Sequence, residues 1–181
     1  FVKNKPDQFI WQSKKDGWNH LYLYDISGRL IKQLTAGKWE VLEVKGFDDK
    51  GENFFYTSTE ESPITKNLYE LNLKSLKTKR LTQATGVHNT ILSDDEKYVI
   101  DSYSNTTDAK TINLTNLKTG KSKLLLQATN PLSAYDLGQV SIFTIKNNEG
   151  TDLYCRLYKP VNFDSTKKYP VVVQRVKQNL R

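Results

Sequence analysis

The two histidines, His20 and His88, are the residues of this sequence best suited to act as a base or a metal ligand near neutral pH. Both lie in stretches that alternate apolar and polar residues, and no cysteine is close to either. No His-x-x-x-His spacing occurs, which removes the commonest zinc pattern on one element. We interpret both as ordinary strand residues, with a ligand or a base as the alternative.

Acidic clusters offer a second kind of chemistry, the binding of calcium. Asp48-Asp49 and Asp94-Asp95-Glu96 are such clusters, but neither has the ligand spacing of a hand-type calcium loop. We interpret both as turn residues. Glu60 and Glu61 begin a loop that runs to Lys66 and could reach the centre of a ring-shaped fold, although a solvated loop is favoured.

Cys155 is the single cysteine, and a thiol nucleophile would need a base beside it, so a half-buried structural role is favoured. Trp18, Tyr22, Tyr24 and Trp39 could form a stacking platform for a sugar or a peptide, but packing between sheets is favoured. The sequence therefore predicts no catalytic residue, no cofactor site and no metal site.

The composition favours a folded chain with a core: 181 residues, 37% hydrophobic and 11% aromatic. No apolar run is long enough to predict a membrane span. The start of the chain shows neither a Met nor a secretory signal, so we expect it to begin inside a longer protein or to have been processed or cut. The net charge is +7, but the lysines are scattered singly through turns, which favours solvated sheet edges over nucleic acid as a partner.

The elements that carry these residues are repeated. A hairpin pattern occurs as "HLYLYDISGRLIKQLTAG" (20–37), "NLYELNLKSLKTKRLTQA" (67–84) and "TINLTNLKTGKSKLLLQA" (111–128). An aromatic or apolar strand precedes each, at 9–13, 54–58 and 98–102. The unit also contains an earlier strand, at 39–44 or 87–93, and an acidic turn. Such a period, about 40–50 residues with four short strands, is typical of a propeller blade.

Apolar and polar residues alternate with a period of two in these segments, which indicates strands and not helices. In "HLYLYDI" (20–26) both faces of the expected strand are largely apolar or aromatic. A strand buried on both faces is expected where sheets stack face to face. We predict an all-β fold, a partial β-propeller of about two to three four-stranded antiparallel blades.

The pattern changes after Ala128. Residues 129–140 predict a short helical or irregular connector, and 141–159 predict a β-hairpin that turns at Asn148-Glu149-Gly150. "KKYPVVVQ" (167–174) predicts the start of a buried strand. The predicted domains are 1–128, blades of a larger propeller; 129–140, the connector; and 141–181, the truncated start of a second domain.

Five segments together resemble one family: "DGWNHLYLYD" (16–25), "GKWEV" (37–41), "NLYELNL" (67–73), "IDSYSN" (100–105) and "KPVNFDSTKKYPVVV" (159–173). They resemble bacterial dipeptidyl peptidase IV, of the prolyl oligopeptidase family of serine peptidases. The resemblance implies a β-propeller followed by an α/β-hydrolase domain, a periplasmic or secreted location, and release of N-terminal X-Pro or X-Ala dipeptides by a Ser-Asp-His triad.

The family's catalytic residues do not transfer to this chain. It contains no Gly-x-Ser-x-Gly elbow, and "YPVVVQ" is followed by "RVKQNLR" in place of the family's Tyr-Gly-Gly-Pro stretch. The family's substrate-binding glutamates belong to an earlier propeller segment, so Glu60 and Glu61 do not inherit that role. We expect this chain to be inactive alone.

Two functions from different classes follow. The first is a non-catalytic propeller fragment of a serine dipeptidyl aminopeptidase that gates and walls the substrate chamber. Its partners would be the peptide substrate, the remaining blades and the hydrolase domain, and exposed sheet faces would favour a homo-oligomer. The second is a stand-alone module that binds a peptide or a glycan. The segment "FDSTKKYPVVV" (163–173) favours the first.

Overall fold

The computed structural model describes residues 1–174, and their regular structure consists of β-strands alone. The strands are β1 (Gln8–Ser13), β2 (His20–Asp25), β3 (Leu30–Gln33), β4 (Val41–Phe47), β5 (Asn53–Ser58), β6 (Asn67–Asn72), β7 (Thr78–Arg80), β8 (Val87–Leu92), β9 (Tyr98–Ser104), β10 (Thr111–Asn116), β11 (Ser122–Gln127), β12 (Val140–Lys146) and β13 (Asp152–Tyr158). No helix of the described residues has the length and apolar character needed to cross a membrane.

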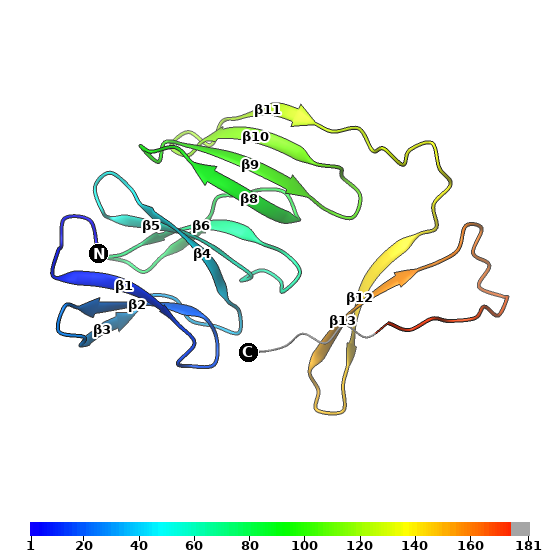
Figure 1. The fold of residues 1–181 in the computed structure, drawn as a ribbon, viewed down its shortest axis with the longest axis horizontal. Coiled ribbons are helices and arrows are strands. Elements are labelled where there is room, and N and C mark those ends of the chain that lie inside the picture. Colours follow the sequence, from blue (N-terminus) through cyan, green and yellow to red (C-terminus); the bar gives the residue numbers. More distant parts are fainter. Residues whose placement is uncertain (175–181) are drawn as a thin grey trace. The chain divides into compact units, whose positions relative to one another are not determined.

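The strands form three sheets in blade order and one separate hairpin (Figure 1). Blade 1 has the order β1-β2-β3, blade 2 the order β4-β5-β6-β7, and blade 3 the order β11-β10-β9-β8. Each strand pairs antiparallel with its neighbours in sequence. The predicted all-β fold with two to three blades is confirmed. The chain divides into two compact units, Phe1–Asn130 and Pro131–Arg181.

Blade 2 shows why the sequence alternates as it does. On β5, Phe54 and Tyr56 belong to the core cluster shared with blade 1, and Phe55 belongs to the cluster shared with blade 3. Successive side chains of a strand point to opposite faces, so a strand between two sheets must be apolar at consecutive positions. A lone sheet could bury only one of these faces, which is why the blades are stacked.

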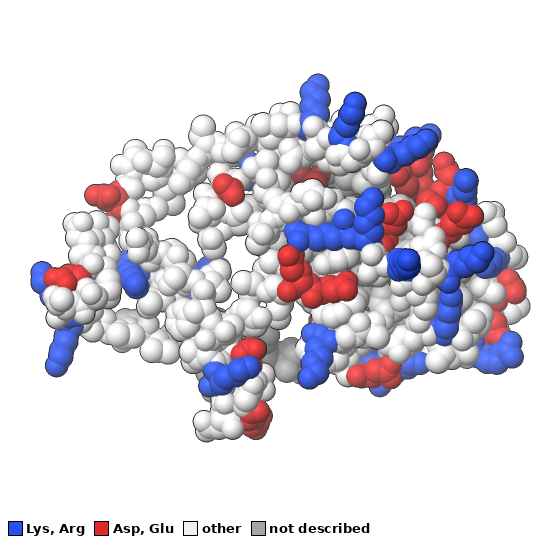
Figure 2. All heavy atoms as spheres, turned by 180° about the vertical axis from the view of Figure 1, so that it is seen from behind, with Lys and Arg blue, Asp and Glu red and all other residues white. Residues whose placement is uncertain are grey.

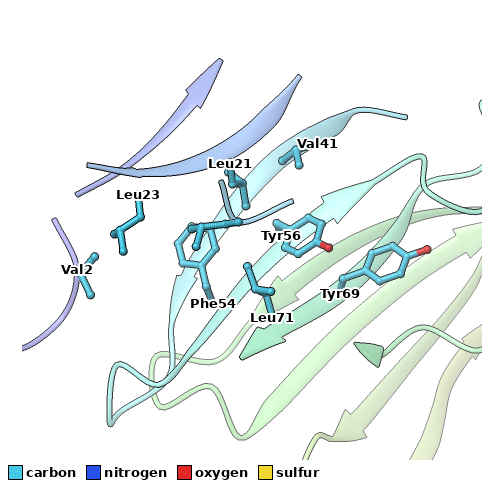
Figure 3. Packing of buried hydrophobic residues seen from close by; sticks show 9 residues of the cluster. Val2, Leu21, Leu23, Val41, Phe54, Tyr56, Tyr69 and Leu71 are labelled. Carbon is cyan, nitrogen blue, oxygen red and sulfur yellow. The ribbon is translucent and has the colours of Figure 1, made fainter. Parts of the chain in front are cut away.

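The larger core lies between blades 1 and 2, and Figure 3 shows its side chains converging from several strands. Its buried members are Val2, Leu21, Leu23, Leu34, Val41, Phe54, Tyr56, Tyr69 and Leu71. Burial of an aliphatic or aromatic side chain of this size contributes about 1.5–3 kcal/mol. This packing holds the ends of the strands, and therefore the loops, in fixed positions.

The turn that precedes the last strand of each blade uses the same kind of hydrogen bond. Asp25, Asn72 and Asn116 end β2, β6 and β10, and each side-chain oxygen accepts the N–H of a residue two or three positions later. Short acidic and amide side chains favour such turns. The sequence repeat is thus also a repeat of turn chemistry.

In the second unit, β12 and β13 form the predicted hairpin, and Asn147 accepts the N–H groups of Glu149 and Thr151 across the turn. The connector contains a turn at 131–134 and no helix. The predicted strand at 167–174 is wrong: these residues adopt no strand, and Val171 to Val173 are exposed. No described strand lies alongside to accept their backbone hydrogen bonds. The predicted divergent tail continues into 175–181, outside the described residues.

Candidate functional site: the loop end of the blades

Most of the residues that could do chemistry gather at one end of the first unit. Five connections form this loop end: 14–19, 34–40, 59–66, 81–86 and 105–110. They leave the blades on the same side in Figure 1. Hydrogen bonds join them, because the N–H of Thr59 bonds the carbonyl of Glu40 and the N–H of Lys66 bonds that of Gly86. Loops on a rigid scaffold commonly carry function, which makes this loop end the candidate site.

His20 begins β2 and is buried. Its Nδ1 lies 3.1 Å from Oγ1 of Thr35, and its Nε2 lies 2.9 Å from the carbonyl oxygen of Gly37. The same Thr35 hydroxyl accepts the N–H of Leu21 at 3.0 Å. His20 therefore closes the end of its hairpin, and neither ring nitrogen is free for a ligand.

Blade 2 repeats this closure with different side chains. The Thr82 hydroxyl donates to Oδ1 of Asn67 at 2.9 Å and accepts the N–H of Leu68 at 3.3 Å. Asn67 and Thr82 are both buried. In blade 3 the residue opposite the start of β10, Thr111, is Gln127, which has no hydroxyl. The repeated "QLT" and "RLT" of the sequence are thus hydrogen-bonding motifs as well as strand ends.

His88 makes a tighter arrangement. Its side chain is fully buried, its Nδ1 lies 2.8 and 2.9 Å from the two carboxylate oxygens of Asp101, and its Nε2 lies 2.8 Å from the carbonyl oxygen of Ala84. Both ring nitrogens therefore lie within hydrogen-bond distance of an oxygen atom. A His-Asp pair resembles part of a catalytic triad, but here a backbone carbonyl stands where a nucleophile would be.

Glu60 and Glu61 have different environments. Glu61 bonds the Arg80 guanidinium at 2.7 Å and the amide of Asn67 at 3.0 Å, so it is a structural residue. Glu60 is exposed, yet partial burial of its carboxylate raises its pKa, and His20 acts in the opposite direction. The carboxylate of Glu60 has no hydrogen bond to another described residue, so it is freer than that of Glu61 to bind another group.

The aromatic residues form an ordered row. Trp39 stacks on Tyr56 at 6.4 Å between ring centroids, and Tyr56 stacks on Tyr69 at 5.6 Å. His20 contacts Trp39 edge-on at 4.7 Å. Figure 3 shows both tyrosines within the core. The Tyr56 hydroxyl is buried without a hydrogen-bond partner, and burial strongly raises the pKa of this group.

Trp18, Tyr22 and Tyr24 do not form a stacking platform for a ligand. Tyr22 is buried beneath the ammonium group of Lys15, which lies 4.1 Å from the ring centroid. The Tyr22 hydroxyl donates to Asp16 at 2.8 Å, and Tyr24 stacks on Phe9 at 5.7 Å. Trp18 is 41% exposed and makes no ring contact among the described residues.

The acidic turns hold their own backbone. Asp48 accepts the N–H groups of Glu52 and Asn53, and Asp95 bonds Ser93 and the ammonium of Lys97. Within residues 1–174, no group of three or more His, Cys, Asp or Glu side chains is arranged to hold a metal ion. The thiol of Cys155, on β13, bonds the carbonyl of Leu153 at 3.6 Å.

Successive antiparallel blades of three or four strands, joined in chain order and packed face to face, define part of a β-propeller. The profile of the dipeptidyl peptidase IV (DPP IV) N-terminal region matches residues 1–110. The chain therefore belongs to the dipeptidyl peptidase IV family.

Related sequences and structures agree with this family. The chain is 30% identical over 179 residues to a probable dipeptidyl peptidase 4 of Arthroderma benhamiae and to dipeptidyl peptidase 4 of Trichophyton rubrum, covering 93% of this chain and 22% and 23% of those proteins. The crystal structure of Porphyromonas gingivalis dipeptidyl peptidase 4 matches with a TM-score of 0.80 at 29% identity, over 90% of this chain and 24% of that one.

A second crystal structure, of a putative dipeptidyl aminopeptidase IV from Bacteroides ovatus, matches with a TM-score of 0.82 at 33% identity. It covers 94% of this chain and 27% of that one. The chain thus spans about a quarter of the length of the proteins it matches.

Proposed function

We propose that this chain is the propeller part of a serine dipeptidyl aminopeptidase that releases X-Pro and X-Ala dipeptides from peptide N-termini. The observation that carries the proposal is the continuous likeness to the Bacteroides ovatus structure over 94% of the chain, blades and hairpin together. A module that only binds a ligand has no need of the hairpin and the extended segment that follow the blades.

The chain contributes walls to this enzyme and no catalytic group. Within residues 1–174, the only His-Asp pair is His88 with Asp101, and that imidazole is buried with both nitrogens engaged. A general base must reach the proton that it removes, which this geometry prevents. The sequence also has no Gly-x-Ser-x-Gly motif to supply the nucleophile.

The decisive experiment compares this chain with the full-length gene product on a chromogenic Gly-Pro p-nitroanilide. We expect no hydrolysis by the chain, and hydrolysis by the full-length protein that a serine-directed fluorophosphate abolishes. Hydrolysis by the chain alone would reveal a catalytic centre that the residues above do not provide. Absence of activity in both proteins would leave the peptide- or glycan-binding module as the better function.

The chamber role has its own test. A propeller that encloses the active site should admit short peptides and exclude folded proteins. The full-length protein is expected to process a Gly-Pro peptide and to leave the same dipeptide intact at the N-terminus of a folded domain. Equal rates on both substrates would contradict an enclosed chamber.

We also propose that the protein is periplasmic or secreted. Its partners would be the remaining blades and a hydrolase domain, and the full-length protein would form a homo-oligomer. Cell fractionation followed by size-exclusion chromatography with light scattering of the full-length protein tests both points. A cytoplasmic monomer would contradict them.

A further inference from the structure

A cleft of about 290 Å³ lies between the outermost strand of blade 2 and the sheet of blade 3. Its walls are residues 79–84, which comprise the end of β7 and the chain that follows, together with parts of β9 and β10 and the turn into β11. This volume is at the lower limit for small-molecule sites. The cleft therefore has room for one side chain or a group of similar size.

Two polar side chains of the cleft are able to donate a hydrogen bond to a ligand. The Lys79 ammonium has no carboxylate within ion-pair distance in residues 1–174, and the Asn113 side-chain amide makes no hydrogen bond there. Asp101 is the only carboxylate in the lining, and His88 already occupies both of its oxygens. A site with an unpaired ammonium group, an amide that can donate, and a carboxylate already bonded to a histidine favours an anionic ligand.

Arg80 fixes the shape of this wall. One of its terminal nitrogens, Nη1, bonds Glu61, and Nη2 bonds the carbonyl oxygens of Gln83 and Ala84 at 3.2 and 2.7 Å. The guanidinium is held in place and its charge is shared with Glu61. Lys79 is consequently the residue whose charge remains available to a ligand.

The approach to the cleft is basic. Lys77, Lys118, Lys121 and Lys123 are exposed, and none has an ion-pair partner among the described residues. In Figure 2, basic side chains project from the upper edge of the molecule, over the β10–β11 hairpin. A surface of one sign raises the local concentration of ligands of the opposite sign.

The strand that carries Lys79 also has a free edge. β7 is three residues long and, among the described strands, pairs with β6 alone, so its other edge has backbone groups that no described strand pairs. Such an edge accepts an extended peptide as an additional strand. An inorganic anion or a free amino acid would use the cleft without using this edge, which is why a peptide fits the two features better.

We propose that an extended acidic peptide adds to the free edge of β7 and places a Glu or Asp carboxylate in the cleft, where it pairs with Lys79 and accepts a hydrogen bond from Asn113. Backbone pairing supplies affinity, and the cleft selects the acidic side chain. This interaction does not depend on the peptidase activity proposed above.

Fluorescence anisotropy of the intact chain tests the proposal with a labelled peptide, Gly-Glu-Val-Glu-Val-Glu-Gly, acetylated and amidated at its ends. The peptide with Gln in place of Glu is the neutral control. We expect Lys79→Gln to weaken binding of the acidic peptide roughly tenfold, as loss of a charge-assisted hydrogen bond does. Asn113→Ala should weaken it about threefold, which gives a second variant should the first fold poorly.

The matched control is Lys5→Gln, which removes the same charge from an exposed lysine in the first unit, away from the cleft lining. It should change the affinity less than twofold. Equal weakening by Lys5→Gln, or equal binding of the neutral peptide, would overturn the proposal. Displacement of the peptide by an equal concentration of inorganic phosphate would also overturn it, because the cleft would then take the anion alone.

Discussion

Leu76 has the same position in the turn between β6 and β7 that Gly120 has in the turn between β10 and β11. The N–H of each bonds the carbonyl of an asparagine four residues earlier, Asn72 or Asn116, at 2.8 Å. Both have left-handed backbone, with φ of 57° for Leu76 and 70° for Gly120. A residue with a Cβ loses about 1–2 kcal/mol in this conformation, whereas glycine adopts it freely.

Leu76→Gly should therefore raise the free energy of unfolding by about 0.5–1 kcal/mol, measured by urea denaturation. The Leu76 side chain is 40% exposed, so its removal costs little burial. Gly120→Ala should instead lower the free energy of unfolding. The added Cβ would meet no atom within 4 Å, so the only cost is the strained backbone conformation. A destabilised Leu76→Gly protein would show that the two turns are not equivalent.

Loss of the hydrogen bonds that close the hairpin in blade 2 should lower the free energy of unfolding by more than the turn substitutions change it. Thr82→Val keeps the shape of the side chain but removes the hydroxyl that bonds Asn67 and the N–H of Leu68. Because both partners are buried, the expected loss of stability is about 1–3 kcal/mol. Thr78→Val, at an exposed position of β7, is the matched control and should change stability by less than about 0.5 kcal/mol. Equal effects of the two substitutions would argue against the closure.

Because His88 and Asp101 are hydrogen-bonded and buried, substitutions at the two positions should have strongly coupled effects on stability. Asp101→Asn should cost about 1–3 kcal/mol, since it weakens the hydrogen bonding of the buried imidazole. The double variant His88→Leu, Asp101→Leu should cost clearly less than the sum of the two single Leu variants, because neither partner is left buried without its hydrogen bond. Denaturation of the wild type, the two single Leu variants and the double variant measures the coupling, and additive losses would contradict it.

The turn at Asp25 predicts a response to acid. The Ser27 hydroxyl, followed by the backbone N–H and the guanidinium of Arg29, lowers the pKa of Asp25 to about 2 from its ordinary value of 3.8. Since the folded pKa is depressed, this stabilisation is complete above the ordinary value and is lost as the pH falls towards 2. Asp25→Asn should flatten the dependence of stability on pH in that window.

Asp25→Asn is a mild substitution because Asn72 and Asn116 already serve as neutral caps in the other two blades. Urea denaturation between pH 2 and pH 5 compares the two proteins. Parallel curves for wild type and variant would show that Asp25 does not titrate differently in the folded state.

The blades could be predicted from the sequence because strand alternation and turn chemistry are local properties that repeat at a fixed period. The partner of His88 could not, since Asp101 is brought close by the register between β8 and β9, in which Thr90, not His88, is opposite Asp101. The hydrogen bonds of Thr82 could not be predicted either, although the sequence shows that Thr82 and Thr35 occupy the same position in repeated segments. The prediction of a strand at 167–174 was wrong because residues with high β-propensity form a strand only where a neighbouring strand pairs with them.

A chain that ends at Asn130 should keep the three blades folded. The core clusters of the blades contain only residues between Val2 and Leu117, and the first compact unit ends at Asn130. Removal of the hairpin should therefore leave the β-sheet circular dichroism and the cooperative thermal transition of the blades intact, with a change in Tm below about 5 °C. A truncated protein without a cooperative transition would mean that the blades depend on the second unit for their stability.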